Sequence, residues 1–137
     1  MLATGRKVYY LTIKDRLVFQ VGRDFEMPYE VACLDITPIT GASQSEFMAV
    51  GLWTDITARL FTLPNEDLSD FVEIESCTQK LGGEIIPRSC MMCKLDEVPY
   101  LMYALGDGSL VYFKFDYLNR VLSERRKINL GELNTSM

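Results

Sequence analysis

The chain has 137 residues, of which 48% are hydrophobic and 24% are charged, and this composition is typical of a globular protein rather than a disordered one. The formal net charge of −5 argues against broad binding to a nucleic-acid backbone. Nowhere do about 18 apolar residues follow one another, which excludes a membrane-spanning helix. The first residues also lack the apolar core of a signal peptide, so we expect an intracellular protein with one domain or a piece of a larger one.

Two short strands are predicted near the N-terminus. Residues 8–13 and 17–22 are rich in β-branched and aromatic residues, and the polar residues 14–16 form a turn between them. Residues 23–29 then make a polar connection that contains Pro28.

Three apolar runs follow, and each ends at a turn signal. They span residues 31–36, 47–53 and 58–63. Alternate residues of a strand point to opposite faces, so the middle run places Phe47, Ala49 and Trp53 on one face and Met48, Val50 and Leu52 on the other. Because both faces are apolar, the sequence predicts a sheet that is covered on both sides.

The second half of the chain repeats this pattern. Residues 66–80 are acidic and ambiguous: residues 71–75 alternate like an exposed strand, whereas residues 65–69 could begin a short helical turn. Four further strands are predicted at residues 89–95, 100–105, 110–115 and 123–130. The last of these is charged, and the repeat has a period of about 50 to 55 residues.

Units of four strands that repeat without helices are typical of a β-propeller, so we predict an all-β fold. Residues 8–22 would supply two strands of one blade, residues 31–78 a second blade and residues 89–130 a third. The charges of the last predicted strand (Glu124, Arg125, Arg126 and Lys127) would protect an outer sheet edge. About two and a half blades cannot close a ring of four to eight, so the chain is expected to be a fragment or part of a larger polypeptide.

Cys90 and Cys93 form a C-x-x-C pattern, which is found in zinc and redox sites. On a strand, however, this spacing places the two thiols on opposite faces, where they cannot share a metal ion. No histidine exists to complete a mixed site. We interpret all four cysteines as reduced residues in or near the core, and we predict no metal site.

An enzyme is not expected. The lack of histidine removes the commonest general base and the usual catalytic triads. The glycine-rich segments at residues 81–84 and 106–108 are followed by neither a lysine nor a helix start, so they are turns rather than phosphate-binding loops. No cofactor is predicted.

Several longer strings carry a family resemblance. They are EVACLDITP at 30–38, GLWTDI at 51–56, LGGEIIPRS at 81–89 and ALGDG at 104–108. With the Arg126–Lys127 segment, these strings resemble, in the same order, the family of the large subunit of the DNA damage-binding complex. The match covers nearly the whole chain, although the segment between Pro64 and Leu81 is longer than the family pattern.

This resemblance implies a segment of the second of three propellers, a WD-repeat-like scaffold that docks the cullin 4 subunit of a ubiquitin ligase. The family acts in protein ubiquitination, the DNA damage response and DNA repair, in the nucleus and the cytoplasm. The implied partners are cullin 4, the rest of the three-propeller chain and its substrate receptors, and this segment is expected to bind neither nucleic acid nor membrane. The alternatives are a structural subunit of the related splicing and polyadenylation factors, or a fragment without independent function.

Candidate partner-binding residues follow from propeller geometry together with the resemblance. The connection into a blade's first strand and the turn between its second and third strands emerge on the same face of a propeller. Residues of both kinds should therefore cluster across two blades and face the cullin: Glu30, Trp53, Thr54, Asp55, Glu84, Arg88 and Asp107. For Trp53, the alternative is a plug between blades, and Arg88 could instead cap Glu30 or Glu84.

Overall fold

The computed structural model describes residues 1–41, 45–53, 56–65, 69–81 and 87–129. Within these ranges the chain is all-β, as predicted, with one short 3-10 helix, η1 (Glu75–Cys77). The strands are β1 (Leu2–Thr4), β2 (Lys7–Tyr9), β3 (Leu11–Lys14), β4 (Leu17–Gln20), β5 (Phe25–Glu26), β6 (Val31–Asp35), β7 (Phe47–Leu52), β8 (Thr57–Thr62), β9 (Val72–Glu73), β10 (Gln79–Lys80), β11 (Pro87–Leu95), β12 (Val98–Leu105), β13 (Ser109–Asp116) and β14 (Val121–Asn129). In this part of the chain, no helix is long and apolar enough to cross a membrane.

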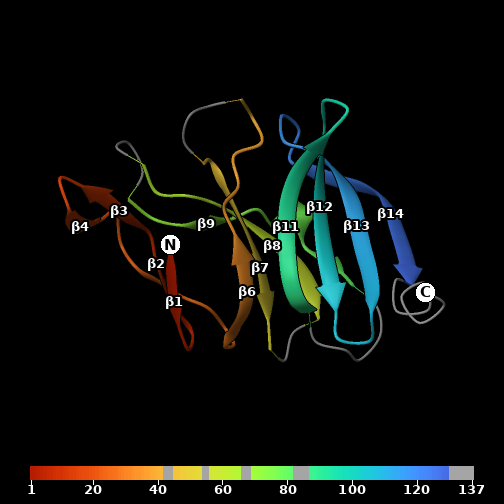
Figure 1. The fold of residues 1–137 in the computed structure, drawn as a ribbon, viewed down its shortest axis with the longest axis horizontal. Helices are drawn as coiled ribbons and strands as arrows, with labels where there is room; N and C mark the ends of the chain where they lie inside the picture. The colour runs from red at the N-terminus through yellow and green to blue at the C-terminus, as the bar shows by residue number, and fades with distance from the viewer. Residues whose placement is uncertain (42–44, 54–55, 66–68, 82–86, 130–137) are drawn as a thin grey trace.

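Three antiparallel sheets follow one another across the molecule (Figure 1). The first has the strand order β1-β2-β5, the second β10-β8-β7-β6 with β9 also on β8, and the third β11-β12-β13-β14. The strands β6 and β11, which begin the second and third sheets, are in contact, because the Asp35 carboxylate on β6 accepts the backbone N–H of Met92 on β11 at 2.7 Å. Sheets packed in this way form a partial β-propeller.

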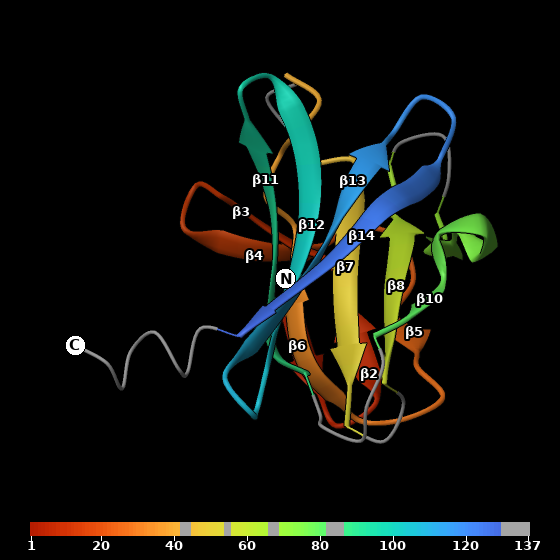
Figure 2. The same ribbon diagram turned by 90° about the vertical axis from the view of Figure 1, so that its right-hand side faces the viewer.

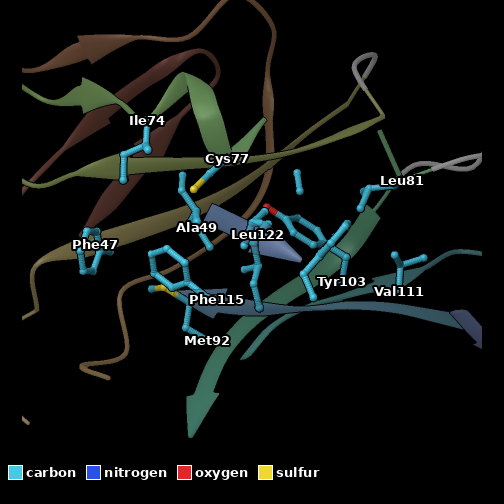
Figure 3. Close-up of a cluster of buried hydrophobic side chains, with 14 of the residues drawn as sticks. Phe47, Ala49, Ile74, Cys77, Leu81, Met92, Tyr103, Val111, Phe115 and Leu122 are labelled. Atoms are coloured by element: carbon cyan, nitrogen blue, oxygen red, sulfur yellow. The ribbon is translucent and has the colours of Figure 1, made fainter. Parts of the chain in front are cut away.

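Strand β7 is buried along its whole length, as its two apolar faces predict. Phe47 and Ala49 belong to the hydrophobic cluster between the second and third sheets, which Figure 3 shows. Met48, Val50 and Leu52 belong to a second cluster between the first and second sheets. The central sheet is therefore covered by a sheet on each side. Trp53, the next residue, leaves this pattern and is 50% exposed.

The N-terminal sheet differs from the predicted pair of strands at 8–13 and 17–22. The first strand is interrupted at Tyr10, and the return strand continues beyond residue 22 to β5. In the ladder, Leu11 pairs with Gln20 and the Val21 N–H donates to the Tyr10 oxygen at 2.8 Å, but Val8 pairs with Phe25, so the return strand bulges out between Val21 and Phe25. Only the tip, β3-β4, is a separate two-stranded hairpin, and β1 adds a third strand that the sequence pattern did not indicate.

A glycine explains why the bulge forms at this place. Gly22 has a φ of +70°, and a Cβ there would lie 2.4 Å from the backbone oxygen of Ser69 and 2.5 Å from Cβ of Pro64. The backbone N–H of Arg23 also donates to the Ser69 oxygen at 2.7 Å. The segment that follows β8, which includes Pro64 and Ser69, is therefore packed directly against the bulge. The residues of the bulge thus lie at the contact between the first and second sheets.

The ambiguous acidic segment divides into three short elements where it is described. Both β9 and β10 pair with β8, and η1 lies between them, so the outer edge of the second sheet is shared by two short strands. A half-buried ion pair of 2.6 Å joins Arg59 on β8 to Glu73 on β9. The suggested helical turn at residues 65–69 lies largely outside the described residues.

The third sheet has four long strands, and all four were predicted within a few residues. Strand β14 is its outer edge and is exposed at every position except Leu122. The sheet face that points away from the core carries the half-exposed side chains of Met91 and Ile128. Leu130, the predicted end of the last strand, lies outside the described residues.

Candidate functional site

Glu30 and Trp53 lie next to each other at one end of the second sheet. The backbone N–H of Trp53, just after β7, donates to the backbone oxygen of Glu30, just before β6, at 2.9 Å. This bond extends the β6–β7 ladder by one step, at the end of the sheet where β6 begins and β7 ends, which is the lower edge of Figure 1. The exposed carboxylate of Glu30 and the half-exposed indole of Trp53 are therefore presented together. A tryptophan buried as a plug between blades would not be 50% exposed.

Arg88 begins the third sheet at the same end. It occupies a bulge in β11, because Pro87 pairs with Leu105 and Ser89 with Ala104, which leaves Arg88 without a partner in the ladder. Its side chain is exposed. Among the described residues, no ion pair joins Arg88 to Glu30, so capping of Glu30 is not observed.

The second and third sheets meet closely just behind these residues. Gly51 on β7 packs against Pro87 on β11, since a Cβ at Gly51 would lie 2.9 Å from Cγ of Pro87 and 2.6 Å from the Cys33 sulfur. There is no space for a larger side chain at this contact. The Pro87 ring and the Cys33 side chain, packed against the backbone of Gly51, therefore set the spacing between the two sheets at the site.

Asp107 lies in the turn between β12 and β13, also at the lower edge of Figure 1. Its carboxylate accepts the hydroxyl and the backbone N–H of Ser109, the latter at 2.9 Å. These two hydrogen bonds lower the pKa of Asp107, with the hydroxyl bond the larger cause. Asp107 is therefore an ionised, exposed residue that shapes the turn.

Of the seven predicted partner-binding residues, the structure brings together Glu30, Trp53, Arg88 and Asp107 at one end of two adjacent sheets. Thr54, Asp55 and Glu84 lie outside the described residues. Tyr29 belongs with this group although the sequence analysis did not select it, because it precedes Glu30 and is 47% exposed. An aromatic residue directly after a proline in a loop could have signalled it. We call Tyr29, Glu30, Trp53, Arg88 and Asp107 the rim.

Behind the rim, a buried tyrosine joins the two sheets. The Tyr103 hydroxyl on β12 donates to the Val50 oxygen at 2.7 Å and accepts the backbone N–H of Arg59 at 3.2 Å. Val50 and Arg59 are paired residues of the β7–β8 ladder. The Tyr103 hydroxyl, from the third sheet, therefore bonds to both strands of this pair in the second sheet. Burial is the main cause that raises the pKa of Tyr103 well above its usual value. This hydroxyl therefore stays protonated and holds the sheets together.

The cysteines have the arrangement that strand geometry predicts. Cys90 faces the second sheet, where its sulfur lies 3.6 Å from the Ala49 oxygen, whereas Cys93 is three residues further along β11. All four cysteines are free. Among the described residues, no group of three or more cysteine, aspartate or glutamate side chains could hold a metal ion.

An open pocket of about 390 Å³ lies at the opposite end of the third sheet. It is lined at the β11–β12 and β13–β14 turns by residues that include Glu97, Lys114 and Leu118. Its position separates it from the rim, which is on the side of the β12–β13 turn (Figure 2).

Comparison with known proteins agrees with this architecture. The family model described as the RSE1/DDB1/CPSF1 second beta-propeller matches residues 1–137. The chain belongs to this family. It is 41% identical over 138 residues to DNA damage-binding protein 1 of Drosophila melanogaster, and 42% identical over 133 residues to DNA damage-binding protein 1a of Arabidopsis thaliana. The matches cover 100% and 96% of the chain.

The same matches cover only 11% and 12% of the two relatives, so the chain corresponds to a small part of their length. The family is a propeller family, and its members named here are binding proteins, which supports a non-enzymatic scaffold segment. The family resemblance seen in the sequence strings is thereby confirmed over the whole chain.

Proposed function

We propose that the rim is part of a docking surface for the cullin 4 subunit of a ubiquitin ligase that acts in the DNA damage response. The observation that carries this proposal is the exposure of Trp53, the single tryptophan of the chain, beside a closely packed contact between two sheets. Large aromatic side chains dominate the binding energy of protein interfaces. The backbone of Trp53 is already fixed by its hydrogen bond to Glu30, so binding would not have to order it, which favours such a role.

The charges around Trp53 suit a helical partner. Glu30 and Asp107 carry negative charge and Arg88 carries positive charge, and all three are exposed at the end of the sheets. Charges at the edge of an apolar contact orient a partner and set the association rate more than they set affinity. Trp53 and Tyr29 would supply the apolar anchor, and the three charges would select the orientation of a cullin N-terminal helix.

A segment swap tests this proposal. The chain replaces the matching segment of the full-length Drosophila relative, and binding to purified cullin 4 is measured with and without Trp53→Ala. We expect the variant to lose about 2 kcal/mol, or roughly 30-fold in Kd. Leu118→Ala is the matched control, because Leu118 is 83% exposed but lies at the opposite end of the third sheet. It should leave the affinity unchanged.

Two results would contradict the proposal. One is an unchanged cullin affinity in a Trp53→Ala variant whose thermal transition matches that of the parent. The other is capture of splicing or polyadenylation factors in place of cullin 4, which would favour the RNA-processing branch of the family. The proposal includes a location in the nucleus and the cytoplasm, which imaging of the tagged full-length protein would test.

A further inference from the structure

Two cysteines from different sheets meet at the contact behind the rim. Cys33 lies on β6, the first strand of the second sheet, and Cys90 lies on β11, the first strand of the third. The Cys33 sulfur is 4.0 Å from the Pro87 oxygen on β11, and the Cys90 sulfur is 3.6 Å from the Ala49 oxygen on β7. Each thiol therefore touches the backbone of the other sheet.

Both thiols lie at this one contact between the sheets, where the Cys33 sulfur is beside Gly51 and the Cys90 sulfur is beside Ala49, two residues apart on β7. The interaction with Cys90 lowers the pKa of Cys33, and the interaction with Cys33 together with burial raises the pKa of Cys90. A thiol with a lowered pKa beside a second thiol is the arrangement in which cysteine oxidation is selective and ends in a disulfide. Both residues are partly exposed.

The backbone around the pair holds it in place. Gly51 is the ladder partner of Cys33, and its missing side chain leaves the space that the Cys33 sulfur occupies. Two residues beyond Cys33, the Asp35 carboxylate binds the Met92 N–H of the other sheet. The sheets are therefore in contact on both sides of the thiols, through Asp35 and Met92 on one side and through Gly51 and Pro87 on the other.

We propose that Cys33 and Cys90 form a modification site for peroxide, at which oxidation produces a disulfide between the second and third sheets. The Cys33 thiolate attacks one peroxide oxygen, an S–O bond forms, the O–O bond breaks, and the leaving hydroxide takes up a proton to give water. Cys90 then attacks the Cys33 sulfenic acid, an S–S bond forms, and the departing hydroxide combines with the Cys90 proton as a second water. In total, two thiols and one hydrogen peroxide give one disulfide and two water molecules. This site does not depend on the cullin proposal.

The pattern of cross-links formed by the intact chain tests this inference. The reduced chain is treated with hydrogen peroxide in native buffer and in urea, the remaining thiols are alkylated, and disulfide-linked peptides are identified by mass spectrometry. In native buffer we expect the Cys33–Cys90 link to exceed every other pairing several-fold and to be reversed by dithiothreitol. In urea this preference should disappear, because closing the long loop between residues 33 and 90 costs more entropy than closing the short loop of Cys90 and Cys93.

Variants assign the reaction to the pair. Cys33→Ser and Cys90→Ser should each abolish the inter-sheet link, and Cys93→Ser is the matched control that should retain it, because Cys93 lies on the same strand but points to the other face. If a serine variant fails to fold, the comparison of disulfide pairing in native buffer and in urea for the parent chain still tests the proposal. Equal pairing patterns in the two samples, or a Cys33 sulfinic acid without a cross-link, would overturn the proposal.

Discussion

Tyr103→Phe is the substitution that most directly tests how the two larger sheets are joined. It removes one oxygen atom from a fully buried side chain and keeps the ring that fills the cluster in Figure 3. The hydroxyl both donates to the Val50 oxygen and accepts the Arg59 N–H. Without it, the Val50 carbonyl loses this buried donor and the partly buried Arg59 N–H loses this acceptor.

The expected cost follows from those two groups. Loss of a hydrogen-bond partner from a buried polar group costs about 1–3 kcal/mol, so Tyr103→Phe should destabilise the fold by about that amount. The ring itself is retained, so no cavity larger than the hydroxyl is created. For a chain of this size, such a loss lowers the melting temperature by several degrees.

Thermal unfolding at a fixed protein concentration, followed by circular dichroism, measures this effect. Tyr100→Phe is the matched control, because Tyr100 lies three residues earlier on β12 and is partly exposed, and it should change stability by less than about 0.5 kcal/mol. Amide exchange at Arg59 should accelerate in the Tyr103 variant and remain unchanged in the control. Equal melting temperatures for the parent and Tyr103→Phe would show that the hydroxyl does not join the sheets.

The pH dependence offers a second check on the same residue. The pKa of Tyr103 is raised in the folded state, chiefly by burial, so the protonated hydroxyl contributes stability below the unfolded pKa and loses it at higher pH. The difference in stability between the parent and Tyr103→Phe should therefore shrink above about pH 10. A difference that stays constant from neutral pH to pH 11 would contradict the assignment.

Three further outcomes are expected. Gly51→Ala should cost about 1–3 kcal/mol in urea unfolding, because its Cβ would lie 2.6 Å from the Cys33 sulfur, and adding Cys33→Ala should restore part of the loss. The lowered pKa of Asp107 favours its ionised form in the folded state, so the stability deficit of Asp107→Ala in thermal unfolding should be present at pH 7 and should narrow as the pH falls below about 4. Elemental analysis of the purified chain should find no stoichiometric zinc, whereas one zinc per chain that is lost on changing Cys90 or Cys93 would refute our interpretation of the C-x-x-C pattern.

The sequence predicts the sheets well where local pattern and burial agree. Strand β7 is apolar on both faces, and only a sheet covered on both sides satisfies that pattern. The four strands of the third sheet are separated by tight turns at residues 96–97, 106–108 and 117–120, so their pairing follows from chain order. These features are local in sequence and need no knowledge of distant contacts.

The N-terminal sheet shows where sequence reasoning fails. Residues 17–22 are predicted as one continuous strand followed by a polar connection at 23–29, and the bulge that interrupts the pairing at Gly22 depends on contacts with Pro64 and Ser69, more than 40 residues away. Strand β1 is three residues long and has no alternation to detect. Asp107 was selected for its place in the propeller, but its role in the turn depends on Ser109, a local signal that was not used.

The rim takes its geometry from the packing behind it. Trp53 has the position it has because β7 is fixed on both faces and because its N–H extends the ladder to Glu30. The position of Arg88 relative to Trp53 is set by the packing of Pro87 on Gly51. The Cys33 sulfur fills the remaining space beside Gly51. A surface built in this way is preorganised, so a partner would bind without first ordering it. It also follows that a change at the contact behind the rim, at Gly51 or Cys33, should alter partner binding although neither residue needs to touch the partner.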